Sequence, residues 1–217
     1  MLIELMELAQ KKMVCSFDTT NRRQGPFTIY DEHNNIRARG FYLDDLREGP
    51  CETYHPSGTL WVRFNYHDGA YHGPFEMFFE NGLLAEQGFY KNGVKDGCFR
   101  TYYSSGLLRS ECMYHNGLPN GSYRFFWKNG QLETDCTYRA GKVHGLCTRY
   151  HENGLLWERC RFNNGMREGL CSTYRPDGLL NKPIFYQHGE RVMTDSSQYV
   201  NTHTILCPSP SFEHQHS

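Results

Sequence analysis

Glycine recurs in this chain at a fixed interval of 24 residues, and this periodicity restricts the fold more than any other feature. Three columns of glycines keep the spacing, and they include every glycine except Gly40 and Gly88. A fixed period of this length is typical of a repeat array, in which one small structural unit is copied along the chain. Numbered from the column that starts at Gly25, the predicted units are 25–48, 49–72, 73–96, 97–120, 121–144, 145–168 and 169–192.

Aromatic columns and paired turn residues indicate the secondary structure of each unit. Positions 6 and 18 are aromatic in all seven units. Two turns per unit are marked by pairs such as Asn81-Gly82 and Asn92-Gly93, which tolerate the two positive φ angles of a type I′ hairpin turn. Short aromatic-rich segments between such turns are typical of strands. The sequence therefore predicts an all-β chain whose seven hairpins form an elongated, twisted antiparallel sheet.

Hairpin geometry predicts which positions share a face. A two-residue loop at positions 9 and 10 pairs position 3 with 16, 7 with 12 and 1 with 18. Positions 3, 7, 12, 16 and 18 then form the predicted packed face, and position 6 lies on the opposite face. We interpret the glycine at position 1 as a gap that accommodates the ring at position 18. A β-bulge would shift this register.

The two ends of the chain lack the repeat. Residues 1–24 are predicted to cap the array, with a short amphipathic helix in 1–13, because apolar residues recur there at helical spacing. A membrane-surface anchor is the alternative role for this helix. Residues 193–217 are polar and irregular, which predicts a mobile tail. Glu4 and Glu7 interrupt the apolar start, so we read no secretory signal and expect a cytoplasmic protein.

Six of the nine cysteines fall in two inward columns, positions 3 and 16, and are predicted to be small buried hydrophobic residues. Equivalent positions of neighbouring units lie two strands apart, about 9.6 Å, too far for a disulfide. Cys147 and Cys160 face each other within one predicted hairpin, so oxidation could bridge this pair.

These columns resemble the MORN repeat, and specifically its variant form with the consensus GxxxxYYxNGxLxxxxxYxNGxxxG. The resemblance covers 25–192, and the segment GCFRTYYSSGLL at 97–108 matches closely. It implies a rod-shaped β-sheet and a scaffolding role, and membrane or phosphoinositide binding is often attributed to the family. Bacterial proteins with the variant repeat are often labelled antitoxins, and giant viruses carry many copies.

The residues suited to chemistry do not form a recognisable catalytic or metal-binding motif. We find no zinc, nucleophile, phosphate-loop or dinucleotide pattern, and the histidines scatter near predicted turns. We therefore expect no enzyme activity, no cofactor and no metal. A formal charge of −1 and a pI near 6.8 argue against nucleic acid as a partner.

Two Trp-x-Arg pairs mark the predicted partner surface, on the same face as the aromatic position 6. Trp, Tyr and Arg are enriched at binding hot spots; the alternative is that each Trp only packs over its neighbouring Tyr. The candidate partner-binding residues are Tyr54, Trp61, Arg63, Tyr150, Trp157 and Arg159.

The sequence thus predicts a non-enzymatic scaffold that binds a protein partner along its sheet. The alternatives are a peripheral membrane module that binds anionic lipid and an array that binds surface glycans. A homodimer through the terminal edge strands is a further expectation, because an open sheet leaves its edge strands unpaired.

Overall fold

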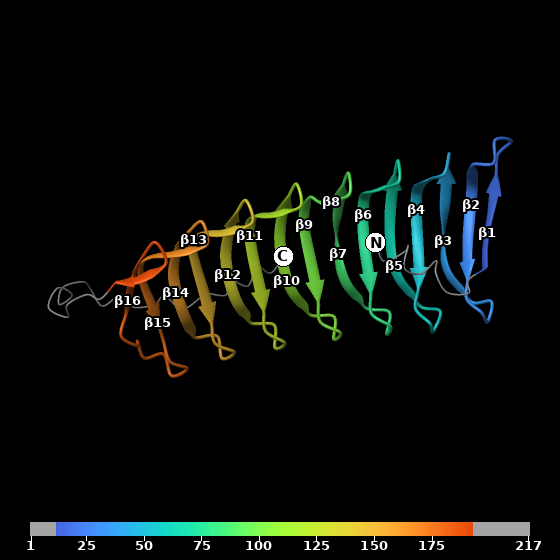
Figure 1. Cartoon of the computed structure of the whole chain (residues 1–217). Helices are drawn as coiled ribbons and strands as arrows, with labels where there is room; N and C mark the ends of the chain where they lie inside the picture. The colour runs from blue at the N-terminus through green and yellow to red at the C-terminus, as the bar shows by residue number, and fades with distance from the viewer. Residues whose placement is uncertain (1–11, 193–217) are drawn as a thin grey trace, which may run out of the picture.

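The computed structural model describes residues 12–192 as one open antiparallel sheet of consecutive hairpins (Figure 1). The predicted all-β fold is confirmed. Strands lie side by side in chain order, and the hairpin turns line the two long edges of the sheet. The strands are β1 (Lys12–Phe17), β2 (Arg23–Tyr30), β3 (Ile36–Leu43), β4 (Leu46–Tyr54), β5 (Leu60–His67), β6 (Ala70–Phe78), β7 (Leu84–Lys91), β8 (Val94–Lys95), β9 (Gly97–Tyr102), β10 (Leu108–His115), β11 (Leu118–Phe126), β12 (Leu132–Arg139), β13 (Lys142–Tyr150), β14 (Leu156–Asn163), β15 (Met166–Thr173), β16 (Ile184–Gln187) and β17 (Glu190–Val192).

The two turns of each repeat differ in type. At positions 20 and 21, pairs such as Asn92 (φ 50°) and Gly93 (φ 83°) both have positive φ, as a type I′ turn requires. At the other turn, positions 9 and 10, only position 10 has a positive φ. An example is Gly82 (φ 81°), whose N–H donates to the carbonyl of Phe79. That turn is a three-residue loop, a type I turn closed by a left-handed residue, so the type I′ prediction is wrong there.

The longer loop changes the strand register next to it. Position 6 pairs with position 12, as in Tyr54 with Leu60, so the predicted pairing of position 7 with 12 is wrong. A β-bulge at position 13 then restores the predicted register, and Thr53 pairs with Val62. From there the pairings of 3 with 16 and 1 with 18 are confirmed, as in Cys51 with Phe64 and Gly49 with Tyr66. Position 13 is therefore the extra residue of the hairpin.

Position 1 is glycine for a different reason from the one predicted. All seven position-1 glycines have positive φ, between 70° and 115°, which side-chain-bearing residues rarely adopt. A Cβ at Gly49 or Gly97 would meet nothing within 4 Å, so no ring at position 18 needs the space. The close approach occurs instead at position 16, where a Cβ on Gly40 would lie 2.8 Å from Phe27.

The core lies on the face formed by positions 3, 5, 14, 16 and 18, which we call the packed face. In the first repeats it consists mainly of rings and aliphatic side chains, with Phe27, Val62, Phe64 and Tyr66 buried in one cluster. Rings along it meet edge to face, as Tyr90 and Phe99 do at 5.4 Å between centroids. Such contacts add to the burial of apolar surface.

Four cysteines continue these columns across four adjacent strands, β12 to β15. All four are buried, and disulfides join Cys136 to Cys147 and Cys160 to Cys171, with Cα atoms 4.3 and 4.4 Å apart. The predicted facing of Cys147 and Cys160 is confirmed, but each of them is bridged to a cysteine of the neighbouring repeat instead. Position 16 of one repeat lies directly opposite position 3 of the next, a contact that pairing within a hairpin does not reveal.

The N-terminal segment adds a strand where a helix was predicted. Lys12 and Met13, the last residues of the predicted helix, belong to β1, which pairs with β2 and places Cys15 opposite Phe27. The helix prediction is wrong for these two residues, because the edge of β2 offers unpaired backbone groups that only a strand can satisfy. The rest of the predicted helix and the predicted tail, 193–217, lie outside the described residues.

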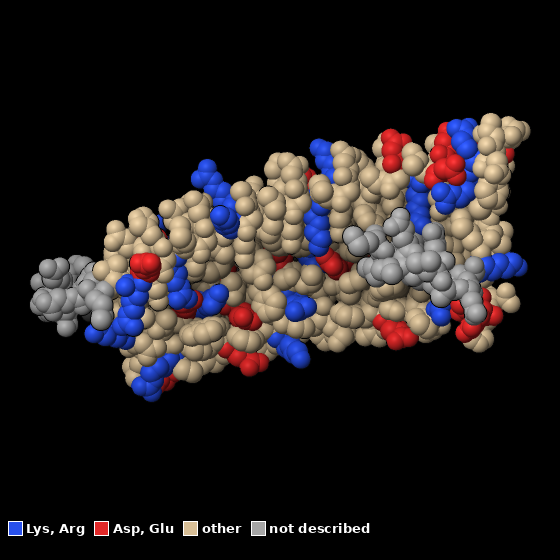
Figure 2. All heavy atoms as spheres, in the orientation of Figure 1, with Lys and Arg blue, Asp and Glu red and all other residues tan. Residues whose placement is uncertain are grey.

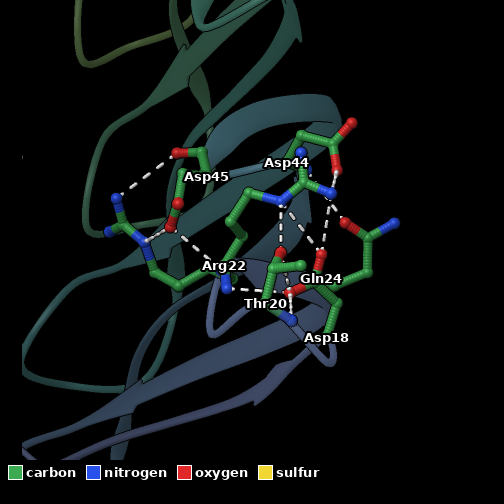
Figure 3. A network of polar contacts seen from close by, with 7 residues as sticks. Asp18, Thr20, Arg22, Gln24, Asp44 and Asp45 are labelled. Atoms are coloured by element: carbon green, nitrogen blue, oxygen red, sulfur yellow. Dashed lines mark hydrogen bonds and ion pairs between the residues drawn. The ribbon is translucent and has the colours of Figure 1, made fainter.

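A polar network fastens the first turn to its neighbour (Figure 3). Asp18 Oδ1 accepts the N–H groups of Thr20 and Arg22 at 2.8 and 2.9 Å, and these bonds hold the pKa of Asp18 well below its usual range. The Arg22 guanidinium also reaches Asp44, at 3.2 Å, in the next turn along the edge. Within residues 12–192, no helix has the length and apolarity needed to cross a bilayer.

Candidate functional site

The candidate site is a groove beside the three-residue turns, which we call the turn-side groove. It is built from positions 5, 7 and 13, and the bulge is what brings position 13 into it. A bulge re-aims the side chain of its extra residue. Arg109 at position 13 accordingly lies 5.6 Å from the ring of Phe125 at position 5 and 6.0 Å from the ring of Tyr103 at position 7. The register of the hairpin therefore decides which side chains line the groove.

Position 7 side chains connect each repeat to the next. Tyr103 Oη donates to the carbonyl of Phe126, and Trp127 Nε1 donates to the carbonyl of Tyr150. His55 and His151 make the equivalent contacts through Nε2, at 3.0 and 2.9 Å. These bonds satisfy the polar atoms of the large rings and fix the position of each ring along the groove. Position 7 was predicted to lie on the packed face, and its aromatic and histidine residues were visible in the sequence, but their bonds to the next repeat were not predicted.

A pocket of about 650 Å³ opens in the middle of the groove, and we call it the central pocket. This volume is in the range of small ligand sites. The pocket is lined by residues from four consecutive repeats. They include Phe79, Tyr103, Arg109, Phe125, Trp127 and Glu133.

The predicted partner-binding residues are divided between the two faces. Trp61 packs against the buried core cluster and lies 5.7 Å from the His55 ring, and Trp157 lies 5.8 Å from His151 in the same arrangement. Both therefore lie in the turn-side groove. The expectation that they share the face of Tyr54 and Arg63 is wrong, because the bulge falls on the Trp position.

Tyr54 and Arg63 do lie together, on the opposite face, through a shared carboxylate. Glu52 accepts from Tyr54 Oη at 2.7 Å and from Arg63 Nε at 3.2 Å, and Arg39 lies over the Tyr54 ring. Burial opposes ionisation of Glu52, but bonds from Tyr54, Arg39 and Arg63 outweigh it and lower the pKa of Glu52. The Tyr54 hydroxyl and the Arg63 guanidinium are therefore already bonded to Glu52.

Tyr150 and Arg159 mark the later end of the array. The carbonyl of Tyr150 accepts the Trp127 indole N–H, and Arg159 is exposed opposite Thr148. The structure does not bring either residue to Trp157 as a single patch. Their role in binding stays a prediction.

An ion-pair ladder runs across the strands of this second face, which we call the charged face. Arg63 bridges Glu52 and Glu76, and Glu111 is held between Arg100 and Arg124. The bond from Arg124, partly offset by burial and aided by Arg100, lowers the pKa of Glu111. Figure 2 shows acidic and basic side chains interspersed along the molecule in that view rather than gathered by sign.

One group of side chains has the composition of a cation site. Ligand atoms of Glu48, His67 and Asp68 lie within 4.8 Å of one another. Glu48 is already engaged, because it contacts His67 Nδ1 at 3.0 Å and accepts the Asp68 N–H at 3.0 Å. The same His–carboxylate contact recurs at the turn of His115 with Asp96. We therefore interpret the group as a contact between successive turns.

Comparisons with known proteins agree with the repeat pattern. The family model for the MORN repeat variant matches five consecutive segments: 47–68, 71–92, 95–116, 119–140 and 143–164. Each segment coincides with one hairpin, from just after one type I′ turn into the next. No curated protein matches the chain at a significant level.

Two solved structures resemble part of the chain. TarM matches at 14% identity and a TM-score of 0.35, over 54% of this chain and 22% of TarM. A mutant of S. aureus TarM in complex with fondaparinux, α-GlcNAc-glycerol and UDP gives the same identity and TM-score, over 55% and 23%. This chain thus spans less than a quarter of those proteins, and a likeness at this TM-score carries no argument about function.

Proposed function

Because the chain belongs to the MORN repeat variant family, we propose that it is a non-enzymatic scaffold that binds another protein along its sheet. The observation that carries this proposal is the turn-side groove. It continues through consecutive repeats and presents aromatic rings and single charges rather than one enclosed reaction centre. Repeat arrays commonly bind partners along such extended, regular surfaces.

Trp157 is the most accessible aromatic anchor in the groove, with 40% of its surface exposed. Arg149 lies over its ring at 5.9 Å while also pairing with the buried Glu158 at 3.5 Å. A ring presented in this fixed orientation loses little side-chain entropy when a partner covers it, which is why tryptophan is common at hot spots. Trp61 is less suited, because it is already packed on the core.

The test is photo-crosslinking from Trp157. A photoreactive phenylalanine analogue replaces Trp157, and a matched variant carries it at Thr137, which is exposed on the charged face. We expect a discrete crosslinked protein from the Trp157 variant alone, and weaker binding of that purified protein to Trp157→Ala. Equal crosslinking from both positions, or unchanged affinity of Trp157→Ala, would contradict the proposal.

Anionic lipid is the competing partner, and co-sedimentation with phosphoinositide-containing liposomes decides it. The mixed charges along the molecule give no polybasic surface in the view of Figure 2, so we expect the protein to stay in the supernatant. Pelleting at physiological salt, where the Debye length is about 8 Å, would favour the membrane role.

A further inference from the structure

The side chains at position 13 show that one part of the turn-side groove is left incomplete. In the other repeats they are engaged within the chain. Arg37 pairs with Asp31 at 3.0 Å, Trp61 and Trp157 each lie against a histidine ring, Ala85 is buried, and Asn181 donates to Thr173 at 3.2 Å.

Arg109 and Glu133 are the exceptions. Within residues 12–192, neither side chain has an ion pair or a hydrogen bond, and both line the central pocket. The Arg109 guanidinium lies over the rings of Tyr103 and Phe125. Burial raises the pKa of Glu133, with Arg149 opposing the shift. A partly desolvated carboxylate and an unpaired guanidinium in one pocket are both expected to gain from a charged ligand.

The charges in the pocket follow one order along the array. At position 13 the cation Arg109 precedes the anion Glu133 by one repeat, and at position 8 the cation Lys128 precedes the anion Glu152 by one repeat. One end of the central pocket is therefore cationic and the other anionic. The rings of Phe125 and Trp127 lie among them in the lining.

We propose that the central pocket binds an extended peptide segment of a partner protein, in which an acidic and a basic residue three positions apart flank apolar residues. The acidic side chain pairs with Arg109 and the basic side chain with Glu133, while the apolar residues pack on Phe125 and Trp127. This inference rests on the proposed scaffold function and names the chemistry of the partner.

The spacing of the charges fits an extended peptide that crosses the strands. Equivalent positions of neighbouring repeats lie two strands apart, about 9.6 Å, and three residues of extended chain span about 10 Å. The lining also continues from Phe79 to Glu152, which lie six strand intervals, about 29 Å, apart. That length exceeds a small molecule and suits a peptide of about nine residues.

The experiment uses the purified chain and synthetic peptides with blocked ends, measured by isothermal titration calorimetry. The probe is Gly-Ser-Asp-Leu-Pro-Lys-Ser-Gly, and a second probe exchanges the Asp and the Lys, because the strand direction of the peptide is open. A neutral twin carries Asn and Gln in their place. We expect one of the charged probes to bind, and the neutral twin to bind at least about tenfold more weakly.

The variants Arg109→Ala and Glu133→Gln test which protein group meets each peptide charge. Arg139→Ala and Asp135→Asn are the matched controls, since both are exposed and lie outside the pocket. We expect Arg109→Ala to weaken the charged probe about tenfold and to leave unchanged the affinity of a probe whose acid alone is neutralised. Glu133→Gln should also weaken the charged probe about tenfold and leave unchanged the affinity of a probe whose basic residue alone is neutralised. The controls should bind both probes as the unaltered chain does.

Three outcomes would overturn the inference. One is the absence of binding by either charged probe, and another is an equal loss in the pocket variants and the controls. The third is full competition by 6-aminohexanoate, which carries the same two charges without a peptide backbone and would indicate a small-molecule site. None of these outcomes affects the scaffold proposal, which the Trp157 crosslinking tests separately.

Discussion

The early and late repeats fill the same core positions with different side chains. In the first repeats a ring at one of positions 3 and 16 faces a small residue at the other, as Phe27 faces Gly40 and Cys51 faces Phe64. In the sixth repeat Cys147 faces Cys160. Both solutions exclude water, since Phe27 is 2% and Cys160 1% exposed. The repeat therefore constrains the backbone and keeps these positions buried, and leaves residue identity free.

The difference also decides how neighbouring repeats are joined. Phe99 lies so close to Gly88 of the preceding repeat that a Cβ there would be 2.5 Å from the ring. Cys136 and Cys147 occupy the corresponding positions two repeats later and are covalently joined. Repeat arrays are stabilised by their nearest-neighbour interfaces. We expect the early part to depend on ring packing and the late part on its disulfides.

The largest effect should follow removal of a ring from the early part. Phe99→Ala leaves a cavity against Gly88 and should lower the free energy of unfolding by about 3–5 kcal/mol, as for other buried Phe deletions. Urea denaturation measures this value. A loss below about 1 kcal/mol would show that the early core does not depend on the ring.

Reduction of the disulfides should act on the late part alone. Each bridge spans 11 residues of sequence, for which the chain-entropy model gives about 2–3 kcal/mol. Hydrogen exchange with and without dithiothreitol should show faster exchange in β12–β15 and unchanged exchange in β2–β7. Uniform acceleration along the array would instead indicate that the two parts unfold as one unit.

Close approach at position 16 predicts a coupled substitution. Gly88→Ala should cost about 1–3 kcal/mol by overpacking, and Phe99→Leu in the same chain should relieve most of that cost. The control is Gly49→Ala, whose Cβ meets nothing within 4 Å and whose cost comes from φ, at +70°. A double-mutant cycle with Phe99→Leu should give no coupling for the control; additive costs at Gly88 would refute the contact.

The smallest effect concerns the charged face, which continues through both parts. The pKa of Glu111 is lowered in the folded chain, so its contribution is present above the unfolded value of 4.5 and is lost as the pH falls through the folded pKa. Glu111→Gln should therefore cost about 1 kcal/mol or less near neutral pH. The difference should disappear in strongly acidic buffer, as urea titrations at both pH values would show.

Much of the fold could be read from the sequence, because glycine and asparagine report backbone conformation directly. The 24-residue period and the aromatic columns predicted hairpins, an all-β sheet and the facing of positions 3 and 16. The segment 12–17 was not predicted to be a strand, because it precedes the first repeat and contains none of the glycines that mark the repeats. Its state is decided by the open edge of β2.

The candidate site was predicted less well, for a physical reason. A pair such as Asn81-Gly82 is compatible with a two-residue and with a three-residue loop, and the choice shifts the register by one residue. The compensating bulge moves position 13 out of the face assigned to it. Trp61 and Trp157 move with it, and Arg109 and Glu133 come to line the same pocket.

By itself, the sequence determined the repeat, the strand content and the core columns, since each depends on local conformation or on a period. Only the tertiary structure decided which columns share a face near the turns, which cysteines meet, and which charges line the central pocket. Those relations depend on register between strands, and register is settled by loop closure and packing across the sheet.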